Sequence, residues 1–541
     1  MKKTRLYIVL SILLGFTFTA CSDWLDVQPV DKTTEQQQYS SEEGILGVQN
    51  GLYQEMASTT LYGGHMSQLA IDALANRYCY YNGASINTQI TIEALAKYKH
   101  TQEESKKIFS SIWSNSYKLI FRVNNYISNV EKSSASMSQE KKDLLLGEGY
   151  ALRAYLHFDL FRMFGPIYSS ATLNDESIPY NDIDPLDGDY TEESITLNNQ
   201  KAENFIKKVL ADIEMAKSLM AKTDPIVDDY STANNIVSVN DQDPHYTNRV
   251  RRFNYFAVRA LEARVRHYID DQQAAVIAQE ILDLEGKGSA TDKSKLFAWH
   301  TDIKGIGGYE DYVFTSEVIF GLPNIKFYVN GDTNFANTDG VTKGYFEANT
   351  FRDLMFNLDG DIRKSLSQNT GKEVAANFHP SDNVTAAFFN KRYSVAPNTT
   401  GTRFYFQPLI RISEMYYIVA ESKVRSANGD FTEAVDYINH FLNKIRKVNS
   451  DFCLGGISSP DLKNTEIATK LNEELLLNFI TKEYYREFGY EGQVFFLLKR
   501  MQSKSTTPIN MVKANTGKFE ALPGTPQEVF VIPMPDSETD I

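Results

Sequence analysis

The stretch of sequence that decides the fold is ISEMYYIVAESKVRSANGDFTEAVDYINHFLNKI, residues 412–445. Its apolar residues recur at helical spacing on both sides of a short turn, which predicts two consecutive helices. At the turn, Gly429 can adopt the left-handed backbone that ends a helix, and the small Ala434 lets the next helix pack closely. Glycine, an acidic residue, an aromatic residue and then alanine form the turn pattern of tetratricopeptide helix pairs.

The same helical spacing extends through much of the chain. Residues 253–282 contain a second, looser helix pair with Asp270-Asp271 at its turn. Residues 144–164 carry two apolar stripes, so this helix is expected to pack between neighbours. Apolar residues at helical spacing also run through 108–127 and 206–220. The sequence therefore predicts a mainly α protein, a superhelical scaffold of tetratricopeptide-type helix pairs.

Three stretches interrupt this pattern, residues 60–100, 170–250 and 284–408. The first is rich in Tyr, Asn and Gly, the second in acidic residues and turn formers, and the third in Gly, Asn, Thr and aromatic residues. Long irregular segments in a compact protein are usually functional or disordered. Because their aromatic residues argue against simple disorder, we interpret these stretches as loop-rich insertions.

The N-terminus predicts export and lipid attachment. A basic start precedes a mostly apolar run, residues 6–18, which is too short to span a membrane and is typical of a secretory signal. Phe18-Thr19-Ala20-Cys21 is similar to a lipobox. Residues 1–20 are therefore predicted to be a lipoprotein signal peptide and Cys21 the lipid acceptor, with a plain secreted protein as the alternative. The polar residues 21–41 predict a flexible tether.

Composition narrows the classes of function. The chain of 541 residues holds 55 Lys and Arg against 69 Asp and Glu, a net charge of −14. So acidic a protein is a poor candidate for binding nucleic acid. The 31 tyrosines suggest aromatic rings at the surface as well as in the core. Cys79 and Cys453 supply no disulfide framework, and either two isolated thiols or one bridge fits the sequence.

The strong enzyme motifs are missing from the sequence, namely a Gly-x-Ser-x-Gly elbow, His-Glu-x-x-His, Cys-x-x-Cys and a phosphate-binding Gly-rich loop. We therefore expect no catalytic residues, no cofactor and no metal centre. A glycoside hydrolase stays an alternative, because its carboxylate pair is defined by separation in space. Asp182, Asp184, Asp187 and Asp189 fit either a solvated acidic loop or a calcium site without the EF-hand order.

Several short motifs follow one another in a recognisable order. They are Cys21 with Asp23 and Pro29, Asn50-Gly51-Leu52-Tyr53, Gly147-Glu148, Leu152-Arg153-Ala154, Phe164-Gly165-Pro166 and Val531-Ile532-Pro533-Met534-Pro535. Together they resemble the SusD/RagB family of outer-membrane nutrient-binding lipoproteins, and the resemblance covers nearly the whole chain. It implies a single SusD-like domain over residues 42–541, in which tetratricopeptide-type helix pairs carry an irregular ligand face.

The resemblance also implies a location and a partner. It places the protein on the cell outer membrane, anchored by lipid and exposed on the outer face. Asp23 and Asp26, near the predicted anchor, resemble a surface-export signal. The implied partner is a SusC-like TonB-dependent transporter, over which the protein sits as a lid.

Oligosaccharides present apolar ring faces, which stack on aromatic side chains, and hydroxyl groups, which pair with planar polar side chains. The candidate ligand-binding residues in the irregular stretches are Asp72, Arg77, Tyr80, Tyr81, Asn82, Trp299, Tyr309, Tyr312 and Arg392. For each tyrosine, packing in the core is the alternative. Core or ion-pair roles are predicted for Trp113, Tyr117, Glu148, Asp159, Arg162, Arg446 and Glu483.

These features lead to the hypothesis of a cell-surface glycan-binding lipoprotein that is not an enzyme and passes oligosaccharides to the transporter. One alternative is an oligopeptide-binding lipoprotein, as in the RagB branch, for which the acidic composition would favour basic peptides. The other alternative is a surface glycoside hydrolase. Sugar identity and linkage do not follow from the sequence, because hydroxyl geometry is set in three dimensions.

Overall fold

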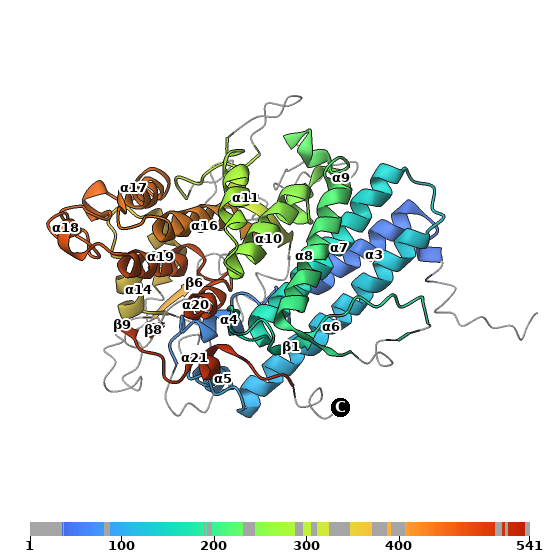
Figure 1. Ribbon diagram of the computed structural model, residues 1–541, viewed down its shortest axis with the longest axis horizontal. Coiled ribbons are helices and arrows are strands. Elements are labelled where there is room, and N and C mark those ends of the chain that lie inside the picture. The colour runs from blue at the N-terminus through green and yellow to red at the C-terminus, as the bar shows by residue number, and fades with distance from the viewer. Residues whose placement is uncertain are drawn as a thin grey trace, which may run out of the picture.

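The computed structural model is mainly helical, which confirms the predicted fold class (Figure 1). The structure describes residues 35, 37–80, 87–188, 190–191, 197–230, 244–286, 296–303, 311–323, 347–369, 387–390, 406–503, 511–513 and 518–535. Cys21, the predicted signal peptide and most of the tether lie outside these residues.

Four long helices form the right-hand part of the molecule in Figure 1. They are α3 Glu42–Met56, α6 Glu103–Lys132, α7 Gln139–Phe164 and α8 Ala202–Met220. Helix α7 contacts both α6 and α8, and nearly all of it from Leu144 to its end is buried, as its two apolar stripes predict. Gly147 allows the close contact with α8, because a Cβ there would lie 2.4 Å from Cγ of Met220.

Helix pairs continue toward the other end of the molecule. They are α10 Tyr255–Tyr268 with α11 Gln273–Leu282, and α16 Ile412–Arg425 with α17 Thr432–His440. Asp270 (φ 66°) and Gly429 (φ 95°) take left-handed conformations at the two turns, which confirms both predicted helix pairs. Because α11 packs on α16, the two pairs stack into one array.

The C-terminal helices complete this array. Helix α17 runs into a short π-helix, η7 Phe441–Ile445, which Arg446 follows directly. The next helices are α18 Ile467–Lys470, α19 Glu473–Glu487, α20 Val494–Gln502 and α21 Pro526–Phe530. Helix α19 packs against both α16 and α20.

Short helices and antiparallel strands occur in the described parts of the predicted irregular stretches, and one further strand pair lies near the C-terminus. The helices are α4 Ala70–Leu74, α5 Asn87–Ala96, α9 Pro244–Thr247 and α14 Asn349–Met355. The strand pairs are β1 Glu176–Pro179 with β2 Asn199–Lys201, β3 Val318–Pro323 with β7 Phe406–Arg411, and β8 Met511–Lys513 with β9 Lys518–Glu520. A three-stranded sheet joins β4 Glu347–Ala348, β6 Ala387–Asn390 and β5 Ser367–Asn369 in that order.

Tyr53 and Glu148, from two of the sequence motifs, meet in the core between the long helices. The Tyr53 hydroxyl donates to Glu148 at 2.8 Å, and Glu148 forms an ion pair with Arg249 at 2.7 Å. Arg249 also pairs with Asp224 at 2.9 Å. These contacts join α3, α7 and the segment before α10, and they confirm the structural role predicted for Glu148.

Other structural predictions are also confirmed. Asp159 and Arg162 form an ion pair on α7. Trp113 is buried and meets Phe164 edge to face at 5.0 Å, while the ring of Tyr117 lies 4.8 Å away from Trp113. This part of α6 is therefore core.

The structure distinguishes between the alternatives left open for the two cysteines and bears on those for the acidic loop. Cys79 and Cys453 are both buried free thiols, so the two-thiol alternative is the one observed. Asp182 and Asp184 each pair with a lysine, at 2.6 and 2.9 Å. Across the described ranges, no group of three or more His, Cys, Asp or Glu could hold a metal ion, although Asp189 lies outside them.

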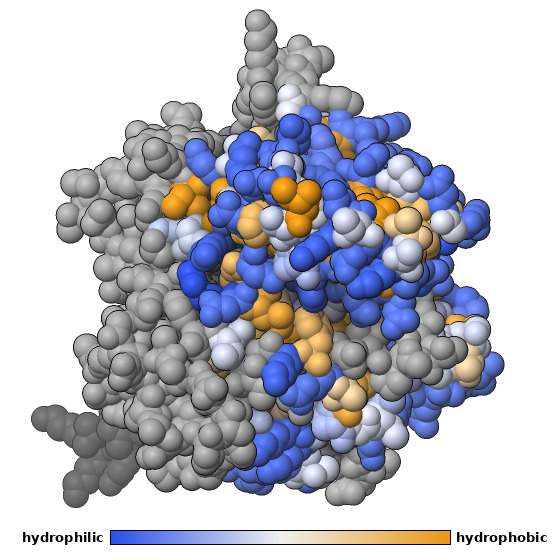
Figure 2. Space-filling view, turned by 90° about the vertical axis from the view of Figure 1, so that its left-hand side faces the viewer, coloured by the Kyte–Doolittle hydropathy of each residue, from blue (hydrophilic) through white to orange (hydrophobic). Residues whose placement is uncertain are grey.

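Figure 2 looks onto the end of the molecule that carries α17, α18 and α19, and apolar side chains there are scattered among hydrophilic ones. Single exposed apolar residues of this kind are ordinary on a protein surface. Within the part of the chain that the structure describes, every helix is too short or too polar to cross a bilayer.

Candidate functional site

Asp72 on α4 and Arg77 just after it lie inside the protein. The Asp72 carboxylate accepts the backbone N–H of Tyr490 at 2.5 Å. Arg77 pairs with Glu347 on β4 at 2.7 Å and donates to the carbonyl of Tyr485 on α19 at 2.8 Å. This placement revises the prediction for Asp72 and Arg77, because side chains with almost no exposed surface position the segment rather than meet a ligand from solvent.

The packing around Arg77 is tight. Its guanidinium lies 4.3 Å from the centre of the Tyr490 ring, and a Cβ on Gly489 would come within 2.3 Å of it. Burial raises the pKa of Asp72 to about 7, although the charge of Arg77 opposes the rise. Glu491 and Glu347 push that pKa further up. Asp72 is therefore the carboxyl of this cluster that titrates near neutral pH.

Tyr80 is the candidate of the first stretch that keeps exposed surface. Its ring is partly buried, and the ammonium group of Lys97 lies 5.3 Å from the ring centre. Tyr81 and Asn82 lie outside the described residues, as do Tyr309 and Arg392 of the third stretch. Ligand contact by these residues stays a prediction.

Trp299 lies in the third stretch, beside the helix pair of residues 412–445. The indole meets Tyr416 of α16 edge to face at 5.8 Å and Phe441 of η7 at 5.6 Å. The side chain is partly buried against the core and keeps some exposed surface. Tyr312, by contrast, is only 5% exposed and packs with Phe314, which favours the packing alternative for this tyrosine.

The residue after Trp299 is held by both of its backbone groups. The N–H of His300 donates to Glu317 at 2.8 Å, and its carbonyl accepts from Arg446 at 2.9 Å. Ala298, on the other side, donates to the carbonyl of Ser316 at 3.1 Å. The backbone on either side of Trp299 is therefore fixed.

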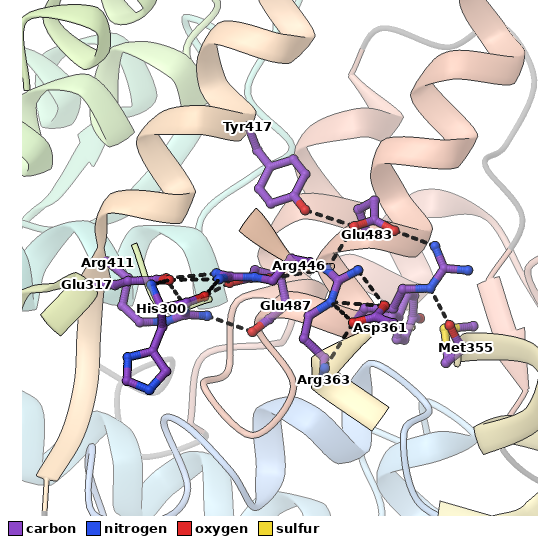
Figure 3. A network of polar contacts seen from close by, with 12 residues as sticks. His300, Glu317, Met355, Asp361, Arg363, Arg411, Tyr417, Arg446, Glu483 and Glu487 are labelled. Atoms are coloured by element: carbon purple, nitrogen blue, oxygen red, sulfur yellow. Dashed lines mark hydrogen bonds and ion pairs between the residues drawn. The ribbon is translucent and has the colours of Figure 1, made fainter. Parts of the chain in front are cut away.

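These contacts belong to a buried set of charges, shown in Figure 3 and here termed the Glu487 network. Its members are Glu317, Asp361, Arg363, Arg411, Arg446, Glu483, Arg486, Glu487 and Glu491. Glu487 accepts from Arg363, Arg411 and Arg446, and the last two also pair with Glu317, at 3.1 and 2.7 Å. The structural roles predicted for Arg446 and Glu483 are confirmed.

The network joins the third stretch to helices α16 and α19. Asp361 and Arg363 follow α14 and pair at 2.7 Å, and Arg363 reaches Glu483 on α19 at 2.8 Å. The hydroxyl of Tyr417 on α16 donates to Glu483 at 2.9 Å. Glu491 pairs with Arg411 at 3.0 Å, and its neighbour Tyr490 bonds Asp72. The group of Asp72, Arg77 and Glu347, here termed the Asp72 cluster, is therefore continuous with the Glu487 network.

The electrostatics of the network do not suit acid-base catalysis. Burial alone would raise the pKa of Glu487, but the guanidinium groups of Arg446 and Arg411 outweigh burial and hold it well below its ordinary value. The pKa of Glu483 is likewise lowered, because Arg363 and Arg486 outweigh burial. A general acid needs a pKa near the working pH. These carboxylates stay ionised and serve as anchors for the backbone.

Several positioning residues were not identified from the sequence. Glu317 and Glu347 lie in the third stretch without a motif, and His300 acts through its backbone. Spacing gives no signal for such residues, because a buried charge is recognised only by its neighbours in space.

Two family models match consecutive regions of the chain. One, described as "Starch-binding associating with outer membrane", matches residues 23–266. The other, described as "SusD family", matches residues 324–540 and so includes the helix pair of residues 412–445. Together they account for most of the sequence.

Two curated relatives from Formosa agariphila, both SusD-like proteins, are similar in sequence. One is 23% identical over 229 residues, which are 40% of this chain and 38% of the relative. The other is 23% identical over 300 residues, which are 54% of this chain and 48% of the relative. The chain thus spans less than half the length of the curated relatives it matches.

Solved structures share the fold. Surface glycan-binding protein A from Bacteroides uniformis has a TM-score of 0.63 at 15% identity, over 92% of this chain and 98% of that one. A SusD superfamily protein from Bacteroides thetaiotaomicron has a TM-score of 0.61 at 18% identity, over 92% and 98%. A SusD-like carbohydrate binding protein from Bacteroides vulgatus has a TM-score of 0.56 at 16% identity, over 86% and 84%. With a fold and two consecutive family models in agreement, the chain belongs to the SusD/RagB family, whose members are non-catalytic binding proteins.

Proposed function

We propose that this protein binds oligosaccharides at the cell surface and delivers them to a SusC-like TonB-dependent transporter. The observation that carries the proposal is Trp299, a partly exposed indole that packs on Tyr416 and Phe441 and is followed by the anchored backbone of His300. A ring fixed before the ligand arrives costs little ordering on binding. The family model described as starch-binding supports a glycan as the ligand class.

Tyr80 offers a second partly exposed ring in another irregular stretch. The proposed ligand-binding residues are therefore Trp299 and Tyr80, joined by Tyr81, Asn82, Tyr309 and Arg392 as predicted from the sequence. The buried Asp72, Arg77 and Tyr312 would act by positioning these segments.

Calorimetry tests the ligand class. Purified protein is titrated with maltoheptaose, other soluble glycans and basic peptides, while new reducing ends are followed in parallel. We expect a glycan to bind without release of reducing ends. Binding of peptides alone would favour the RagB-like alternative, and reducing ends formed at an enzymatic rate would favour a hydrolase.

Variants test the site. Trp299→Ala and Tyr80→Ala should each weaken glycan binding about tenfold, because ring stacking adds about 0.5–1.5 kcal/mol beyond the buried area. Tyr190→Ala is the matched control, since Tyr190 is 42% exposed and follows the acidic loop after β1. Equal affinity for all three variants and the wild type would remove both rings from the site.

The proposal includes attachment to the outer membrane through Cys21, after removal of residues 1–20. Cys21→Ala should abolish acylation and release the protein from the membrane fraction, while the body from about residue 40 stays folded. Protease treatment of intact cells should digest the wild-type protein if it is exposed on the outer face. Full protection in cells with intact membranes would contradict that orientation.

The transporter is the proposed partner on family grounds. Detergent extracts of cells that express both proteins should yield a TonB-dependent barrel together with this chain. A stable complex of this kind buries more than about 1,200 Å² in total, so it should survive gel filtration. Repeated isolation of the chain alone would count against the partnership.

A further inference from the structure

A groove of about 450 Å³ opens between the N-terminal segment, α3 and α6. Its volume falls within the about 300–1,000 Å³ typical of small-molecule sites. Helices α3 and α17 lie at opposite ends of the molecule (Figure 1), so the groove is remote from Trp299, which packs beside α17 on Tyr416 and Phe441. None of the candidate ligand residues lines this groove, although Gly51 and Leu52 of the Asn50-Gly51-Leu52-Tyr53 motif do.

The groove walls carry polar groups in bonded pairs. Asn125 of α6 donates from its amide to Glu35 at 2.6 Å. Arg122, one turn earlier, pairs with Glu55 of α3 at 2.7 Å. Gln38 adds a second amide to the lining. Each pair sets a hydrogen-bond donor beside a carboxylate acceptor.

These donor–acceptor pairs favour a ligand that carries several hydroxyl groups. A sugar hydroxyl donates to a carboxylate and accepts from an amide or guanidinium at the same time. Arg122 remains 50% exposed and Glu55 24% exposed, so both can meet a ligand without leaving their pair. With two carboxylates and one guanidinium, the groove does not attract a phosphate or another anion.

The floor of the groove is left open by a glycine. Gly51 lies within α3, and a Cβ built there meets no atom within 4 Å. A glycine inside a helix is destabilising relative to alanine. Gly47, one turn earlier on the same helix, also has open space around a Cβ but does not line the groove.

We propose that this groove is a second saccharide site, in which the Asn125–Glu35 and Arg122–Glu55 pairs read vicinal hydroxyls of a short oligosaccharide. The inference rests on the proposed function, since the same glycan would engage both sites. A glycan long enough to span both sites would bind more tightly than at either one, whereas a short oligosaccharide occupies each site separately.

Gly51→Phe tests the site by filling it, and Gly47→Phe is the matched control on the same helix. The probe is the glycan that binds most tightly in the panel, with maltoheptaose first. Calorimetry of the wild type and Gly47→Phe should give two sites per chain, and Gly51→Phe should give one. Trp299→Ala should keep the groove site. Melting curves verify that each variant is folded.

Arg122→Ala keeps the test decisive if Gly51→Phe does not fold, because its exposed side chain can be removed without opening the core. In Arg122→Ala we expect the affinity of the groove site to fall about tenfold. One site in the wild type, unchanged in Gly51→Phe and Arg122→Ala, would overturn this inference and leave the proposed function intact. No glycan binding by the wild type at all would overturn both.

Discussion

Buried charges are arranged differently in the two halves of the molecule. Around α7 they form small groups of two or three charges, such as Arg153 with Asp212 at 2.7 Å and Arg249 with Glu148 and Asp224. Around α19 they form a shared network, in which Glu487 meets three arginines. The small groups occur where apolar stripes already align the helices. The shared network occurs where irregular backbone, such as that of His300, has no helical ladder to hold it.

Removing an arginine from the network should have the largest effect. Arg446→Ala leaves Glu317 and Glu487 buried with one counter-charge fewer and takes the donor from the His300 carbonyl. Breaking a buried pair in this way costs about 3–5 kcal/mol. Urea denaturation should show a loss of this size. A loss below about 1 kcal/mol would mean that the network does not hold the third stretch.

Trp299→Ala should have the next largest effect, because the indole packs on Tyr416 of α16 and Phe441 of η7. Loss of a fully buried Trp costs about 3–5 kcal/mol, and Trp299 is only partly buried, so we expect about 1–3 kcal/mol in thermal denaturation. Trp299→Phe, which keeps a ring against Tyr416 and Phe441, should lose less. Unchanged affinity together with a large stability loss would place Trp299 in the core alone.

Asp72→Asn should produce a smaller effect that depends on pH. Asp72 has a folded pKa of about 7 against about 4 for a free Asp, so folding takes up a proton between these values. Its stabilising contribution is complete below about pH 4 and is lost as pH rises to about 7. The amide still accepts from Tyr490. The stability advantage of the variant over the wild type should therefore be larger near pH 8 than near pH 4.5 by at least about 1.4 kcal/mol, one pKa unit.

The wild type also contains buried histidines that act in the opposite direction. Burial lowers the pKa of His157 and of His245 to about 3, so their contribution to stability falls as pH drops below about 6.5. The difference between wild type and Asp72→Asn cancels this background. Parallel stability curves for the two proteins from pH 4.5 to 8 would contradict the role given to Asp72.

Arg122→Ala should have the smallest effect on stability. Its partner Glu55 is also partly exposed, and exposed pairs contribute about 0–1 kcal/mol. The variant thus serves as the surface counterpart of Arg446→Ala in the same urea series. Losses of equal size in the two variants would show that burial does not separate the two classes of pair.

The sequence by itself determined the scaffold. Helical periodicity, Gly429 at the turn of residues 412–445 and the apolar stripes of residues 144–164 are local features, and neighbouring residues along the chain decide them. The ion pair of Asp159 with Arg162 was predictable for the same reason, because residues three apart share one side of a helix. Family membership also followed from short motifs read in order.

Only the tertiary structure decided which polar residues of the irregular stretches lie inside. Asp72 meets Tyr490 and Arg77 meets Tyr485, across separations of 418 and 408 residues. Tyr80 and Arg77 are three residues apart in one segment, yet one keeps exposed surface and the other does not. The physical reason is that burial of a charge depends on the partners that distant segments bring to it, and one-dimensional spacing carries no record of them.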